Sequence, residues 1–307
     1  MQFSGMILSG GFTYSSPPPP GGTKKAIFGY GSSNAARTSV TNLVSNTGVV
    51  SNDVTGVGTA REGLAAAGYG TDKAIFGYGF YSTITNLVSN TGVVATDGVG
   101  AGTARLFTAA AGYGTDKAIF GYGFSDASVS ISVTNLVSNT GVVANNTTGV
   151  GTARYLLAAA GYGTDKAIFG YGGTTVGAVS ITNKVSNTGV VATDTAGVGS
   201  ARGGPAAAGY GNDKAIFGFG GAGTNIINLV SNTGVVANDT SGVGTGRSQL
   251  AAAGYGSDKA IFGYGSNSVG NEVSMTNLVS DTGVVASDTI GVGFSRFSLA
   301  AAGYSTT

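Results

Sequence analysis

A phrase of seven residues, Lys-Ala-Ile-Phe-Gly-Tyr-Gly, recurs six times along the chain at intervals of 44 to 49 residues. The copies begin at Lys25, Lys73, Lys117, Lys166, Lys214 and Lys259, the fifth with phenylalanine in place of tyrosine. The phrase Ala-Ala-Ala-Gly-Tyr-Gly precedes the last five copies and begins at Ala65, Ala109, Ala158, Ala206 and Ala251. It returns once more at Ala300, where it ends in Ser305. Self-similarity with this period indicates a repeat architecture. Because the first unit lacks its opening phrase and the last unit lacks its continuation, the complementary ends predict an array that closes into a ring.

Composition narrows the class of protein to a packed β fold. Glycine accounts for 56 of the 307 residues and recurs with the unit, not at every third position as in collagen. Charged residues make up 9% of the chain, against about 25% in a typical soluble domain, and hydrophobic residues make up 42%. This balance does not fit a disordered segment. The abundance of valine, isoleucine, threonine and aromatic residues favours strands.

The charge pattern predicts no nucleic-acid partner and no membrane span. The net charge is +1, and no basic run is longer than Lys24 and Lys25, so the basic patch of a nucleic-acid-binding protein is missing. No apolar stretch approaches the roughly 20 residues of a membrane helix. The segment that starts at Met1 lacks the charged beginning of a secretory signal. Without cysteine, disulfides do not report the redox compartment.

One unit read in detail predicts four short strands and no helix. Residues 155–162 and 166–171 are apolar runs separated by a Gly-Thr-Asp turn signal, which indicates a tight hairpin. Upstream, residues 128–138 alternate polar and apolar side chains, the pattern of a strand with one buried face. After a turn that contains Gly141, residues 142–144 form the fourth expected strand.

Sheets of four strands that repeat about every 40 to 50 residues are typical of propeller blades. We therefore expect an all-β, six-bladed β-propeller over residues 23–307, closed by pairing of residues 25–30 with residues 299–304. Such pairing would hide the exposed edges of the two terminal strands. The alternative β architecture is a parallel solenoid, which repeats in shorter rungs and needs caps instead of complementary ends.

Residues 1–22 lie outside the repeat. They contain an apolar piece that includes Phe3 and Tyr14, followed by four prolines that form a stiff spacer. Two interpretations remain open at this point. The segment is either a disordered lead-in or a docking arm that holds a partner away from the ring, with Phe3 and Tyr14 as candidate contacts.

Residues 182–221 carry the motif order of a known family. A turn motif, a short strand and Arg202 precede a strand of small residues, and a hairpin then leads to a hydrophobic strand that ends in Gly220 and Gly221. This order resembles the kelch repeat, and the resemblance covers about residues 23–307. The chain departs from that family in having no tryptophan, and only one other unit, with Gly172 and Gly173, has a glycine pair after its hydrophobic strand.

The phrasing also resembles kelch-like repeat proteins of marine tailed phages, where such rings are virion or fibre components. The resemblance implies a virion protein made in the host cytoplasm and acting as a docking or host-binding propeller. Its partners would be other virion proteins, contacted through residues 1–22, and a host-surface glycan or protein. The alternative function is an extracellular, microbial glycan-binding lectin or adhesin at the cell surface.

The residue inventory predicts that the chain is not an enzyme and has no cofactor. It has neither histidine nor cysteine, which removes Ser-His triads, thiol nucleophiles and most metal sites. One arginine recurs in every unit, at Arg61, Arg105, Arg154, Arg202, Arg247 and Arg296. We expect these arginines to tie neighbouring blades together; the alternative is a ring of guanidinium groups that binds anions in a channel.

Candidate binding residues lie where the units differ. The segments that follow each Lys-Ala-Ile-Phe phrase vary in length. The two residues directly after each repeated arginine vary in type. Function in repeat scaffolds is usually carried by loops on one face, so we expect these segments to gather there. The candidate binding residues, chosen mainly as exposed aromatics, are Phe80, Tyr81, Phe107, Phe124, Tyr155, Asn267 and Phe297.

Overall fold

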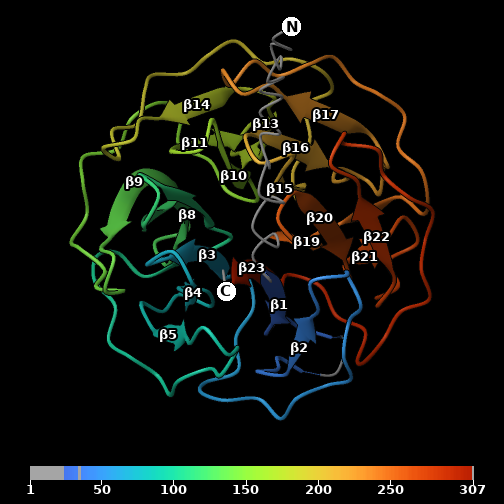
Figure 1. The fold of residues 1–307 in the computed structure, drawn as a ribbon. Coiled ribbons are helices and arrows are strands. Elements are labelled where there is room, and N and C mark those ends of the chain that lie inside the picture. Colours follow the sequence, from blue (N-terminus) through green and yellow to red (C-terminus); the bar gives the residue numbers. More distant parts are fainter. Residues whose placement is uncertain (1–23, 34–35, 306–307) are drawn as a thin grey trace, which may run out of the picture.

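The computed structural model describes residues 24–33 and 36–305 of the chain. The predicted arm, with Phe3 and Tyr14, lies outside the described residues. Those residues form strands and connecting segments without a helix, so the prediction of an all-β fold is confirmed. Figure 1 shows small sheets arranged around a common centre, each with one strand nearest that centre.

Each unit contributes an inner, a middle and an outer strand, paired antiparallel in that order. The inner strands are β3 (Ala65–Tyr69), β7 (Ala109–Tyr113), β10 (Ala158–Tyr162), β15 (Ala206–Tyr210), β19 (Ala251–Tyr255) and β23 (Ala300–Tyr304). The middle strands are β1 (Lys25–Gly29), β4 (Lys73–Gly77), β8 (Lys117–Ser125), β11 (Lys166–Gly170), β16 (Lys214–Gly218) and β20 (Lys259–Gly263). The outer strands are β2 (Thr41–Val44), β5 (Thr85–Val88), β9 (Ser130–Val137), β14 (Thr182–Val185), β17 (Ile227–Val230) and β22 (Thr276–Val279).

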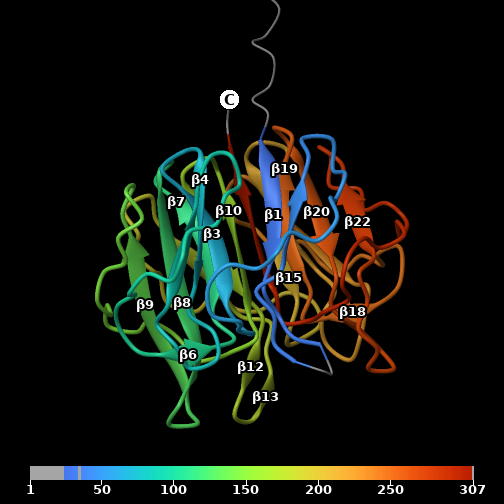
Figure 2. The ribbon, with the colours of Figure 1, turned by 90° about the horizontal axis from the view of Figure 1, so that it is seen from below.

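Five further strands of two residues each lie in the connections of the described chain. They are β6 (Arg105–Leu106), β12 (Gly173–Thr174), β13 (Gly177–Ala178), β18 (Arg247–Ser248) and β21 (Ser266–Asn267). Figure 2 shows β12 and β13 extending from one end of the molecule, together with the tip that joins β8 to β9. The turns between inner and middle strands lie at the opposite end.

The predicted hairpin and the predicted pairing of the chain's two end segments are both present. Tyr162 pairs with Lys166 across the hairpin of β10 and β11. In the same way, Tyr304 of β23 pairs with Lys25 of β1, so strands from opposite ends of the sequence share one sheet. Unlike β10 and β11, however, β23 and β1 are not joined by a turn of the chain.

The expected fourth strand is wrong. Residues 142–147 are not a continuous strand: they meet β9 at two isolated bridges, Val137 with Val143 and Thr134 with Thr147. Between these bridges, Ala144 N donates to Leu136 O at 2.8 Å. Three steps along β9 therefore face four steps along its neighbour, which is the offset of a β-bulge. The side-chain amide of Asn135 fills the gap, because its Nδ2 donates to the carbonyl of Ala144 at 3.0 Å.

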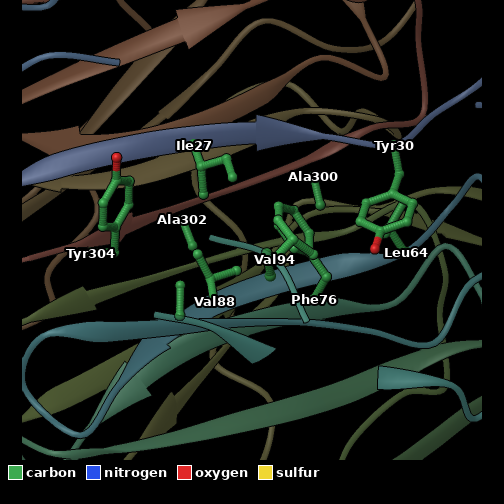
Figure 3. Close-up of a cluster of buried hydrophobic side chains, with 11 residues drawn as sticks. Ile27, Tyr30, Leu64, Phe76, Val88, Val94, Ala300, Ala302 and Tyr304 are labelled. Carbon is green, nitrogen blue, oxygen red and sulfur yellow. The ribbon is translucent and has the colours of Figure 1, made fainter. Parts of the chain in front are cut away.

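Neighbouring sheets pack through aromatic rings set against glycine. In the cluster of Figure 3, Tyr30 from the first sheet meets Phe76 from the next, with ring centroids 5.1 Å apart and the rings edge to face. The Phe76 ring lies against Gly29, where a Cβ would come within 2.8 Å of it. The same glycine–phenylalanine contact recurs at Gly77–Phe120, Gly121–Phe169, Gly170–Phe217, Gly218–Phe262 and Gly263–Phe28. The last of these contacts returns to the first sheet.

Backbone hydrogen bonds between the inner turns also form a cycle. An amide in each turn donates to a carbonyl in the turn of the next unit, at 2.7 or 2.8 Å. The pairs are Gly70–Asp116, Gly114–Asp165, Gly163–Asp213, Gly211–Asp258, Gly256–Lys24 and Ser305–Asp72. We call this end of the molecule the turn face.

Candidate binding surface

The variable segments gather at the end of the molecule opposite the turn face (Figure 2). We call this end the variable face. Its two sets of segments are joined by backbone hydrogen bonds: Phe80 N donates to Glu62 O at 3.0 Å, and Ser32 N donates to Phe297 O at 2.9 Å. Besides the described part of 31–39, the face comprises residues 79–83, 123–130, 172–180, 220–225, 265–273, 62–63, 106–107, 155–156, 203–204, 248–249 and 297–298.

Three of the candidate aromatics form one cluster on the variable face. The ring of Tyr155 lies 5.2 Å from that of Phe124, edge to face, and 6.4 Å from that of Phe107. Pairing of Leu106 with Phe124 between β6 and β8 brings the two chain segments together. All three rings are partly exposed. We call Phe107, Phe124 and Tyr155 the aromatic cluster.

A second pair of candidate aromatics, Phe80 and Tyr81, packs beside the side chain of Arg37. Phe80 and Tyr81 are 46% and 40% exposed, and their ring centroids lie 6.2 Å apart. The guanidinium carbon of Arg37 lies 3.2 Å from the Phe80 centroid, a cation–π contact. Both aromatics have left-handed backbones, with φ of 45° and 54°, a conformation that bulky residues adopt only under tertiary constraint.

The two remaining described candidates lie in other units and serve their own segments. The Asn267 side-chain oxygen accepts hydrogen bonds from the amides of Val269 and Asn271, at 3.1 and 2.9 Å, and so shapes the turn after β21. Phe297 exchanges two backbone hydrogen bonds of 2.9 Å with Ser32. The structure therefore brings five of the seven described candidates into two groups and leaves these two apart.

A small hollow at the centre of the variable face was not foreseen from the sequence. Its volume is about 70 Å³, and its lining residues come from all six units. They are Gly63, Leu64, Phe107, Thr108, Leu156, Leu157, Gly204, Pro205, Gln249, Leu250, Ser298 and Leu299. Gln249 and Ser298 hydrogen-bond through their side chains, whereas Phe107 and Leu156 are apolar. The hollow is consequently polar on one side and apolar on the other.

Backbone hydrogen bonds hold the rim of this hollow in a second cycle. Each unit contributes one residue to this cycle. All six of these residues have a left-handed backbone, with φ between 51° and 66°. The amide-to-carbonyl pairs are Phe107–Gly63, Leu156–Phe107, Gly204–Leu156, Gln249–Gly204, Ser298–Gln249 and Gly63–Ser298. The sequence signal for this site was only that these positions vary between units.

The repeated arginines are buried, and each directly precedes a segment of the variable face. All six are at most 2% exposed. The Nη2 of every one of these arginines donates to a buried asparagine, as Arg61 Nη2 does to Asn86 Oδ1 at 2.5 Å. Arg61 Nε also donates to Tyr78 O at 2.8 Å, a contact that Arg202 and Arg296 repeat. The Arg61 guanidinium also lies 4.5 Å from the ring centroid of Tyr30 in the preceding sheet. Burial lowers the pKa of Arg61, and burial of the Tyr30 hydroxyl raises the pKa of Tyr30 to about 12, against the opposing effect of the Arg61 charge. Arg61 thus joins two sheets.

A separate cavity of about 300 Å³ runs between the inner strands and opens at the turn face. Alanine and glycine line its wall, and no arginine is among its lining residues, so the idea of a guanidinium-lined channel does not fit this cavity. Lysines surround the mouth: Lys24, Lys73, Lys117, Lys166, Lys214 and Lys259. Most bond to the aspartate before them, as Lys73 Nζ does to Asp72 Oδ1 at 2.7 Å. That hydrogen bond lowers the pKa of Asp72 and raises the pKa of Lys73.

Within residues 24–33 and 36–305, no group of three or more acidic residues is placed to hold a metal ion. In the same ranges, no helix has the length and apolar character needed to cross a bilayer. A scan against family models finds no match, and no curated protein is significantly similar to the chain.

Proposed function

We propose that the chain is a six-bladed propeller of kelch type. Three features support this architecture. Each unit forms one antiparallel sheet, neighbouring inner strands are in contact all the way from β3 through β23 and back to β3, and β1 and β23 share a sheet. Antiparallel pairing within every unit favours blades over the parallel rungs of a solenoid.

We propose that this scaffold is a non-enzymatic binding protein and that the variable face is its binding surface. The observation that carries this proposal is the aromatic cluster. Phe107, Phe124 and Tyr155 converge from two units at positions that vary between units, although the second unit has Phe80 at the position of Phe124. Partly exposed aromatic side chains that meet in one patch are typical of interaction hot spots. The remaining positions of the unit are nearly invariant, and their side chains pack within and between the sheets.

The proposed setting is a tailed-phage virion, in which residues 1–22 dock to other virion proteins and the variable face contacts a host-surface glycan or protein. Support for this setting comes from the resemblance in phrasing to phage kelch-like proteins. The alternative is a microbial extracellular lectin, which the same cluster would serve because sugars stack on aromatic rings. Detection of the chain in purified phage particles would favour the first setting.

A glycan array followed by matched variants tests the binding surface. For a glycan or host-cell preparation that binds the wild type, Tyr155→Ala should weaken binding about tenfold or more. Val49→Ala is the control, because Val49 is 66% exposed and follows the turn whose Gly48 packs against Tyr255 at the turn face. Equal binding by the wild type and Tyr155→Ala would contradict the assignment of the variable face.

A further inference from the structure

The turn face has one position that breaks the repeat. Five units place an aspartate before the lysine of the middle strand, and the unit that contains β1 places Lys24 there instead. The backbone of Lys24 behaves as the aspartates do, since its carbonyl accepts a hydrogen bond from Gly256 N at 2.8 Å. Lys24 therefore occupies the backbone position of the aspartates but carries the opposite charge. The five aspartates are Asp72, Asp116, Asp165, Asp213 and Asp258.

The Lys24 side chain lies against the inner wall at the mouth of the cavity. A Cβ built on Gly303 would lie 2.9 Å from Lys24 Cε, and one built on Gly254 would lie 3.9 Å from Lys24 Nζ. These glycines belong to β23 and β19, the inner strands that border the cavity. The absence of side chains at both glycines leaves room for the ammonium group to lie between the two strands.

Within the described residues, Lys24 is the cavity-lining lysine without a carboxylate partner. Lys73, Lys117, Lys166 and Lys259 each contact the preceding aspartate within 2.9 Å, and Lys214 lies 3.8 Å from Asp213. Burial lowers the pKa of Lys24, and no carboxylate of the described chain acts on it in the opposite direction. A partly buried ammonium group without a counter-charge favours an anion as its partner.

The space beside Lys24 fits a small ligand. The cavity of about 300 Å³ is lined near its mouth by the hydroxyl-bearing residues Thr71, Thr115, Thr164 and Ser257 and by Asn212. Below them, the alanines and glycines of the inner strands offer no competing charge. We propose that the cavity mouth binds a small anion that carries phosphate or carboxylate groups, with Lys24 as the residue that holds it. This inference does not depend on the function proposed for the variable face.

Isothermal titration with two probes, inorganic phosphate and citrate, tests the site and distinguishes the two anion chemistries. The wild type should bind at least one probe. Lys24→Asp should weaken that binding about tenfold or more, because it replaces the unpaired cation by a carboxylate. Lys24→Arg should bind within about threefold of the wild type, since it keeps the charge. Lys184→Ala is the control, because Lys184 lies on the outer strand β14 and donates to Thr233 O.

Lys24→Asp is a safe variant for folding, since it gives this unit the Asp-Lys pair present in the other five. Its thermal unfolding midpoint in probe-free buffer should match that of the wild type or exceed it. Failure of both probes to bind the wild type, or unchanged affinity in Lys24→Asp, would overturn the proposal.

Discussion

At the scale of single residues, each unit is held by a chain of polar side chains that runs from its buried arginine to exposed residues at the surface. Asn86 accepts from Arg61 and donates to Asp97 Oδ1 at 3.0 Å. Asp97 in turn accepts from Thr59, whose hydroxyl lies 2.6 Å away. This network fastens the outer segment of one unit to the connection that enters it. Because Asn86 is fully buried, it depends on these partners for its hydrogen bonds.

Asp97 offers a test of this network, because the third unit has asparagine at the equivalent position. Asn146 Oδ1 accepts from Thr103 N at 3.1 Å and from Asn135 Nδ2 at 3.0 Å, as Asp97 does from its partners. The hydroxyl bond is reversed, because Asn146 Nδ2 donates to Thr103 Oγ1 at 2.8 Å. We expect Asp97→Ala to lower the free energy of unfolding by about 1–2 kcal/mol. Asp97→Asn should cost less than about 1 kcal/mol. Urea denaturation measures both, and equal losses in the two variants would contradict the network.

The pH dependence of the same pair gives an internal control. Burial would raise the pKa of Asp97, but hydrogen bonds from Thr59 and Asn86 outweigh it, so the pKa lies below its ordinary value. A carboxylate whose pKa is lower in the folded state stabilises the protein at pH values above its unfolded-state pKa. That contribution is lost as pH falls through the folded-state pKa. The difference between wild type and Asp97→Asn should therefore shrink below about pH 4.

At the scale of elements, the inner, middle and outer strands were predictable, since the strand expected at residues 128–138 is β9 (Ser130–Val137). The segment after the outer strand and the rim were not. Period, turn residues and apolar runs identified the hairpins, because these signals are local. The fourth strand failed because the bulge opposite Asn135 depends on a side-chain hydrogen bond. Likewise, nothing local predicts a left-handed backbone at Phe107 or Leu156, since tertiary hydrogen bonds impose it.

The contact between each middle strand and the next sheet makes a further prediction. A Cβ at Gly77 would lie 2.6 Å from the Phe120 ring, so Gly77→Ala should lower the free energy of unfolding by about 1–3 kcal/mol through overpacking. Gly203→Ala is the matched control, because the nearest atom to its Cβ would be at 3.8 Å. The double variant Gly77→Ala with Phe120→Leu should lose less free energy of unfolding than the sum of the losses in the two single variants. Additive losses would show that the two residues do not meet.

At the scale of the whole molecule, three independent sets of contacts run through every unit and return to the first. They are the backbone bonds of the turn face, the backbone bonds of the rim around the central hollow, and the glycine–phenylalanine contacts between sheets. Each set crosses the junction between β23 and the first or second unit, for example through Ser305 N and Asp72 O at 2.7 Å. In a cycle of this kind every unit is supported by two neighbours.

The stability of the molecule should therefore depend on β23 far more than on an ordinary terminal segment. Deleting residues 300–305 removes the inner strand of the β1 sheet and leaves Ile27 and Phe28, both fully buried, without cover on one side. We expect this variant to lose cooperative thermal unfolding. The control is a circular permutant in which Thr306 is joined to Lys24 and the chain is opened between Gly270 and Asn271. Lys25 pairs with Tyr304 as Lys73 pairs with Tyr69, so the three linking residues reproduce the length of the turn in the other units. The permutant should unfold cooperatively within a few degrees of the full chain, because it keeps all three cycles. If the chain without β23 unfolds at the wild-type temperature, the sheets are not held together as a closed set.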